Sequence, residues 1–271
     1  RDPLWSRGLG DVYKRQVYRV AYSPEHLAKL GKAAAQKDSA FSLEDRVGLV
    51  SDAFTLAQAG YSKTSGGLAL MHALRGDDSS LVNTAAALNL AKLASVWWEQ
   101  PEPVREGINK FRADVFGPMA RELTFEFGAN DSRELRELRE TVISAAASAG
   151  DEWTISEIRR RFAPLQEKGD YSLIHPDLLR TVLAQAIKHG GEKEYETVLS
   201  IYRSPPTPAH KTSAMIALGN AQDTALLQRT IDFLFSGHVK TQDFMYFFAS
   251  LSSNPRSRLS LIHISEPTRP E

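Results

Sequence analysis

The hydrophobic and polar residues of this chain change their spacing close to its start. Residues 17–22 alternate, with Tyr18, Val20 and Tyr22 on one side of the run. A period of two residues predicts a short β-strand. Ser23 and Pro24 then have the character of a helix N-cap and first helical position. The pattern predicts a seam at which a strand gives way to helices.

From residue 24 to residue 251 the apolar residues recur at helical spacing, and short breakers separate the runs. Ser42 and Asp45 resemble a capping box, and Gly60 closes the helix that they begin. Within a helix over residues 104–127, Gly117 and Pro118 predict a break or a kink. The links between runs are short, which makes consecutive helices antiparallel neighbours, and we count about eleven or twelve helices.

Helical hairpins with one apolar stripe each must stack on their neighbours to bury that stripe. The predicted fold is therefore all-α, an irregular, right-handed α-solenoid of the HEAT or armadillo type with a short strand at its N-terminal seam. The hairpins differ in length and no clean repeat is visible, so an irregular globular bundle is the alternative. Two aromatic segments, VWWE at 96–99 and FMYFF at 244–248, are too apolar for single faces, and we expect them to fill the core.

Composition excludes several classes of function. Lys plus Arg and Asp plus Glu each number 33, which argues against a nucleic-acid partner or a polybasic membrane surface. The chain has no cysteine, so disulfides, thiolate metal sites and cysteine nucleophiles are excluded. No apolar run reaches the ~18 residues that a transmembrane helix needs.

The sequence contains no recognised catalytic motif. None of its 7 histidines has another histidine four residues away, so no H-E-x-x-H zinc helix is present. A nucleophile elbow, a Walker loop and a dinucleotide fingerprint are absent as well. His189 precedes a glycine pair at a predicted helix C-terminus, where the helix dipole favours a partly charged imidazole.

One basic cluster stands out, IRRRF at residues 158–162. Ile158 and Phe162 are four apart and point inward, so Arg159, Arg160 and Arg161 fan around the other faces of the helix. The cluster is either a solvated basic turn or a site that captures a carboxylate, for which guanidinium groups are well suited.

The two ends of the chain match no helical or strand template. Residues 1–16 and 259–271 have the character of translated sequencing-adapter read-through, and we leave them out of the fold prediction. The expected native domain is then residues 17–258, and we expect the natural protein to continue past both ends.

Four segments together resemble the C-terminal helical domain of zinc metallo-aminopeptidases of the puromycin-sensitive and endoplasmic-reticulum type. They are VYRVAYSPEHLAKL, SLEDRVGLVSDAFTLAQAG, IHPDLLRTVLAQAIKHGGEKEYETVLSIYRS and VKTQDFMYFFASLSSNPRSR. The resemblance covers residues 17–258 and is closest to the fungal cytosolic members. It implies a cytoplasmic protein, and it implies that the seam strand joins a β-sandwich, which in turn joins a catalytic domain outside this chain.

In that family the helical domain closes over the active site and encloses the distal part of the peptide. The resemblance therefore implies a non-catalytic domain with peptide substrates and no nucleic-acid partner. The zinc belongs to the catalytic domain, so no catalytic or metal-binding residue is expected here. A peptide brings its carboxylate into the enclosed space, and Arg159, Arg160, Arg161, Lys211 and Arg229 are the candidate contacts. The alternatives are a stand-alone helical-repeat scaffold that binds another protein and, without any motif behind it, an independent enzyme.

Overall fold

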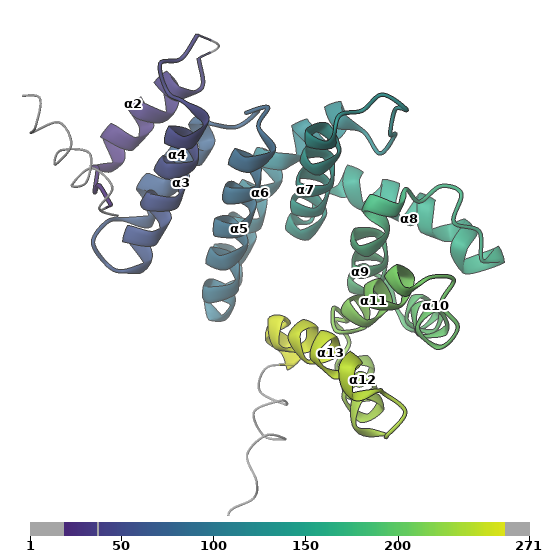
Figure 1. Ribbon diagram of the computed structural model, residues 1–271. Coiled ribbons are helices and arrows are strands. Elements are labelled where there is room, and N and C mark those ends of the chain that lie inside the picture. Colours follow the sequence, from purple (N-terminus) through teal and green to yellow (C-terminus); the bar gives the residue numbers. More distant parts are fainter. Residues whose placement is uncertain (1–18, 37, 258–271) are drawn as a thin grey trace, which may run out of the picture. The chain divides into compact units, whose positions relative to one another are not determined.

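The described part of the chain, residues 19–36 and 38–257 of a computed structural model, is built of α-helices with short links (Figure 1). It holds helices α2 to α13 and two short 3₁₀ helices, η1 and η2, and these residues contain no strand. The all-α prediction is confirmed. The helices fall into two compact units that divide between Asp77 and Asp78, and each unit is described by itself.

The first unit contains α2 (Pro24–Ala34), α3 (Leu43–Gln58) and α4 (Thr64–Ala73). Helix α4 packs against both of the others, and its Leu70 is fully buried. The predicted capping box is present, because the side chains of Ser42 and Asp45 each accept from the other's backbone N–H. Arg46 donates to Asp77 over 2.6 Å and ties α3 to the end of the unit.

The second unit follows the order α5 (Ser80–Val96), η1 (Trp97–Glu99), α6 (Glu102–Leu123), α7 (Arg133–Ala149), α8 (Glu152–Lys168), η2 (Pro176–Leu178), α9 (Leu179–His189), α10 (Glu192–Arg203), α11 (Pro208–Leu218), α12 (Thr224–Phe235) and α13 (Thr241–Ser253). Side-chain caps begin most of these helices, for example Asp151 on α8 and Asp223 on α12. Gly150 and Gly169 end α7 and α8 in the left-handed conformation.

The helices of the second unit stack in two rows. Helices α5, α7, α9, α11 and α13 pack one on the next, and α6, α8 and α10 form a second row (Figure 1). Because short links reverse the chain at each step, the odd-numbered helices run in the same direction. Their C-terminal ends therefore lie on one side of the row. The packing is that of stacked helical pairs, and a HEAT-like repeat stays a prediction.

Two details of the fold bear on the sequence-based expectations. Residues 19–22 form no strand; an extended segment without a partner has no ladder to complete, and Arg19 instead pairs with Asp52 of α3 over 2.5 Å. Helix α6 continues through Pro118, so of the two predicted outcomes the break is absent, and the kink stays a prediction. Pro118 has no backbone N–H, so one hydrogen bond of the helix is missing there. Packing of α6 against both α7 and α8 holds this turn in the helical conformation. Residues 1–16, 17–18 and 259–271 lie outside the described residues.

The two aromatic segments do not fill the core as expected. In residues 96–99 the side chain of Val96 is exposed and both tryptophans are half-buried. In residues 244–248 only Phe247 is buried, where it meets Tyr202 and Phe233 edge-on. Five consecutive positions of a helix point in all directions, so α13 can bury only one stripe.

A close helix contact yields a testable prediction. A Cβ atom added at Gly219, the C-cap of α11, would lie 2.8 Å from Ser250 Cβ and 2.9 Å from Leu251 N of α13. Gly219→Ala should therefore push α11 and α13 apart and lower the free energy of unfolding by about 1–2 kcal/mol. Chemical denaturation followed by circular dichroism measures it. The matched control is Gly107→Ala, at an exposed position inside α6 where an added Cβ atom would have no neighbouring atom within 4 Å. This change should raise the free energy of unfolding by up to about 1 kcal/mol. Equal effects of the two changes would contradict the close contact.

Candidate functional site

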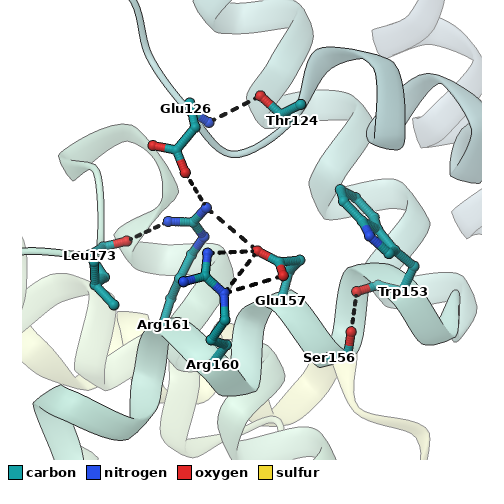
Figure 2. Close-up of polar contacts among 8 residues, drawn as sticks. All are labelled: Thr124, Glu126, Trp153, Ser156, Glu157, Arg160, Arg161 and Leu173. Carbon is teal, nitrogen blue, oxygen red and sulfur yellow. Dashed lines mark hydrogen bonds and ion pairs between the residues drawn. The ribbon is translucent and has the colours of Figure 1, made fainter.

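The three arginines of the IRRRF cluster lie on α8 but have different contacts, and Figure 2 shows those of Arg160 and Arg161. Arg161 is buried, with a side chain only 6% exposed. Its Nη1 donates to the carbonyl of Leu173 over 3.1 Å and its Nη2 to Glu126 over 2.6 Å. The guanidinium also lies 4.9 Å from the centre of the Phe125 ring. Arg161 thus joins α8 to the α6–α7 link, which holds Glu126, and to the link after α8, which holds Leu173.

Arg160 and Arg159 face outward. Arg160 donates to the carboxylate of Glu157 over 2.9 Å, one turn earlier on the same helix (Figure 2). Arg159 donates to the carbonyl of His189 over 3.4 Å. Within the described residues Arg159 has no carboxylate partner, which leaves most of its five donors for a ligand.

Lys211 and Arg229 lie on other helices and have acidic partners. Lys211 of α11 pairs with the buried Asp243 of α13 over 2.5 Å. Arg229 of α12 pairs with Glu196 and, at 3.8 Å, with Glu192, both of α10. The structure therefore does not bring the five predicted contacts into one site. Their role in capturing a carboxylate stays a prediction. Among the five, Arg159 is the candidate that has no carboxylate partner within the described residues.

The structure reveals a second cationic site, which we call the α5–α13 cavity. It has a volume of about 470 Å³. Its lining comes from the C-terminal ends of α5, α7, α9 and α13, the turn η1, the first half of α6 and the α11–α12 link: Ala94, Ser95, Trp97, Trp98, Arg105, Ile108, Asn109, Arg112, Ser148, Lys188, Gln222, Ser253, Asn254, Pro255 and Arg256. Among these described residues there are four cationic side chains and no carboxylate.

The two inner cations of the α5–α13 cavity have only neutral acceptors. Arg112 is 6% exposed, and its Nη1 donates to Asn109 Oδ1 over 3.0 Å. Its Nε is buried and has no hydrogen-bond partner. Lys188 Nζ donates to the carbonyl of Ser148, in the last turn of α7, over 3.0 Å. Helix C-termini carry a partial negative charge, which explains how two cations are tolerated here.

Burial lowers the pKa values of the basic groups in this region. Desolvation and, secondly, the charge of Arg112 lower the pKa of Lys188 from 10.5 to about 8. Desolvation also lowers the pKa of the Arg112 guanidinium. The pKa of His189 falls to about 4, chiefly through desolvation and then through Lys188 and Arg159. The expectation of a partly charged His189 is therefore wrong, because burial and two neighbouring cations outweigh the helix dipole.

Sequence reasoning missed this cavity, although a local signal exists. Arg112 interrupts the buried stripe of Ile108, Val115 and Met119 on α6. Lys188 continues a buried polar stripe of Thr181 and Gln185 on α9. A charge on an inward stripe is uncommon unless it has a partner or a function. Which inward charges meet in space depends on contacts between distant helices, and the sequence does not reveal those contacts.

Comparison with known proteins places the chain in a family. The profile of the ERAP1-like C-terminal domain matches residues 14–265. The chain belongs to this family. The resemblance derived from the four sequence segments is therefore confirmed.

The relatives are aminopeptidases. The chain is 34% identical over 229 residues to the alanine/arginine aminopeptidase of Saccharomyces cerevisiae, covering 84% of this chain and 26% of that protein. It is 29% identical over 230 residues to aminopeptidase 2 of Candida albicans, covering 85% and 25%. Aminopeptidase M1-A of Oryza sativa is 26% identical over 249 residues, covering 90% and 28%. The chain spans about a quarter of the length of these relatives.

Neither a metal site nor a membrane span emerges from the described residues. No group of three or more His, Cys, Asp or Glu side chains lies where it would hold a metal ion within residues 19–36 and 38–257. No helix in that part of the chain is both long and apolar enough to cross a bilayer.

Proposed function

We propose that this chain is the non-catalytic C-terminal domain of a zinc aminopeptidase, in which it encloses the active site and accommodates the distal part of the peptide substrate. The match of the family profile to residues 14–265 is the observation that carries the proposal. The relatives are named aminopeptidases, the family resemblance implies a zinc enzyme, and the chain aligns with about a quarter of their length. Catalytic and β-sandwich domains of the same polypeptide are then the expected partners.

We assign the zinc of the proposed aminopeptidase to its catalytic domain, as the family resemblance implies, and derive no step from it here. The contribution of this domain is then binding. The cytoplasmic location stays a prediction, and one relative, of Saccharomyces cerevisiae, carries the word mitochondrial in its name.

Peptide binding predicts a dependence on substrate length. In the full-length polypeptide that carries this domain, Arg159→Ala should lower kcat/KM for a peptide of about nine residues by about tenfold, because one guanidinium–carboxylate contact is lost. Single-residue aminoacyl amides do not reach the domain and should be unaffected. Steady-state kinetics on both substrates measure the difference.

Two controls frame this experiment. Arg160→Ala removes a neighbouring arginine that already pairs with Glu157 and should change neither substrate. The 271-residue chain alone should show no turnover. If Arg159→Ala changes long and short substrates equally, Arg159 does not hold the peptide end. Turnover by the isolated chain that a chelator abolishes would refute the non-catalytic role itself.

A further inference from the structure

We infer that another cavity of the second unit, here called the α10–α13 cavity, binds the phosphate group of a small molecule. Arg203 and Lys240 hold the phosphate, and Lys211 keeps the wall of the cavity in place. This inference rests on the cavity itself and not on the aminopeptidase role.

The α10–α13 cavity lies where the α10–α11 link meets the α12–α13 link. Its volume is about 560 Å³, which is within the usual range for small-molecule sites. Helix α11 packs against both α10 and α13 in this part of the unit (Figure 1). The wall combines two aromatic rings, a proline and four basic side chains.

Charge balance is the first argument. The basic residues are Arg203, Lys211, His238 and Lys240, and the described lining residues include no carboxylate. Lys211 is neutralised by the buried Asp243, which does not line the cavity. Arg203 and Lys240 are exposed and have no acidic partner within the described residues. Their two charges match the two negative charges of a phosphate monoester better than the single charge of a carboxylate.

Free hydrogen-bond donors are the second argument. The guanidinium of Arg203 offers five donors and the ammonium group of Lys240 offers three. In the described part of the chain these donors have no acceptor. Helix α13 begins after Lys240 without a side-chain cap, so the backbone N–H groups of its first turn are also available to an anion.

The aromatic wall is the third argument. Tyr202 is buried, and Phe233 meets it edge-on with ring centres 5.6 Å apart. The guanidinium carbon of Arg203 lies 6.0 Å from the centre of the Phe233 ring, a cation–π distance that places this donor group at the wall. The rings and Pro205 give a ligand an apolar surface. The cavity therefore suits a phosphate ester with an apolar body better than a free phosphate.

The wall is held in place before any ligand binds. Lys211 Nζ lies 5.1 Å from the centre of the Tyr202 ring. Its ion pair with Asp243 joins the beginning of α11 to α13, and the Tyr202 hydroxyl donates to the same carboxylate over 3.5 Å. Pro205 and Pro206 restrict the backbone of the α10–α11 link. A site that is ordered in advance loses little conformational entropy on binding.

Titration of the 271-residue chain with phenyl phosphate tests the inference, at constant ionic strength set with chloride. Binding should shift the backbone amide signals of Thr241 and Gln242 in nitrogen-edited NMR spectra. Arg203→Met and Lys240→Met should each weaken binding by tenfold or more. Both side chains are exposed, so neither change should disturb the fold. The matched control is Lys193→Met, at the other end of α10 and outside the cavity, which should bind like the wild type.

Two related anions identify the group that is bound and its source. Benzoate has the same ring with a carboxylate in place of the phosphate, and it should bind at least about fivefold more weakly because it carries one charge fewer. Inorganic phosphate lacks the ring. If it binds more weakly than phenyl phosphate, the natural ligand is an ester; if it binds equally well, the ligand is free phosphate. Either result supports the site.

Three outcomes would overturn the inference. The first is the absence of any shift at Thr241 and Gln242 with about 50 mM phenyl phosphate, a concentration that detects even a millimolar Kd. The second is binding that Arg203→Met and Lys240→Met leave unchanged. The third is benzoate binding as tightly as phenyl phosphate, because the cavity would then not select a phosphate.

Discussion

Arg161→Ala is expected to lower the free energy of unfolding of the second unit by about 2–4 kcal/mol, because it removes a buried, hydrogen-bonded guanidinium and leaves a cavity. The variant deletes the bonds to Glu126 and to the carbonyl of Leu173 together with the contact on Phe125. The α6–α7 link and the link after α8 would lose their common anchor. Urea denaturation followed by helical circular dichroism measures the loss.

The neighbouring arginine is the matched control for this change. Arg160 is 52% exposed and pairs only with Glu157 in the same helix, so Arg160→Ala should leave the denaturation midpoint close to that of the wild type. Arg161→Lys should recover only part of the loss, since an ammonium group cannot make the forked contact of a guanidinium. Equal stability of the two alanine variants would show that Arg161 is not a structural residue.

The Arg159–Arg161 cluster also shows what the sequence reveals and what it conceals. Inward positions for Ile158 and Phe162 follow from helical spacing, and both side chains are buried. The difference between Arg160 and Arg161 follows from partners 12 and 35 residues away. No local pattern reveals such partners, so the sequence alone treats the three arginines alike.

Helix ends were predicted well because their causes are local. The Ser42 capping box and Gly60 after α3, which has a positive φ, act within a few residues of themselves. The errors arise where tertiary packing prevails. Met245 of the aromatic segment is exposed, and residues 19–22 have no strand to pair with among the described residues.

The α5–α13 cavity could not be predicted from the sequence, for the same reason. Its cations come from α6, from α9 and from the segment after α13, which are far apart in the sequence. The stacking of hairpins brings them together, because it places the C-terminal ends of the odd-numbered helices on one side. The family assignment, in contrast, rests on extended similarity along residues 14–265 and needs no knowledge of this convergence.

Replacing the ammonium group of Lys188 should stabilise the protein. A fall of its pKa from 10.5 to about 8 means that folding disfavours the charged form by about 3 kcal/mol. Lys188→Met keeps the length of the side chain and removes the charge. Loss of the hydrogen bond to Ser148 costs about 1 kcal/mol of this stabilisation. The free energy of unfolding near neutral pH should therefore rise by about 1–3 kcal/mol. Denaturation of both proteins in parallel measures the gain, and Lys110→Met should show none.

The extra stability of Lys188→Met should decrease between about pH 8 and 10.5 and be lost above that range. Because the folded pKa of Lys188 lies below the unfolded one, the unfolded chain binds more protons between about pH 8 and 10.5, and wild-type stability rises with pH there. Below pH 8 both states are protonated and the full penalty applies; above 10.5 neither is charged and the penalty is gone. The advantage of Lys188→Met should therefore be constant up to about pH 8 and shrink above it. A difference that is independent of pH from 7 to 10 would show that Lys188 is fully solvated and that its charge is not held in the cavity.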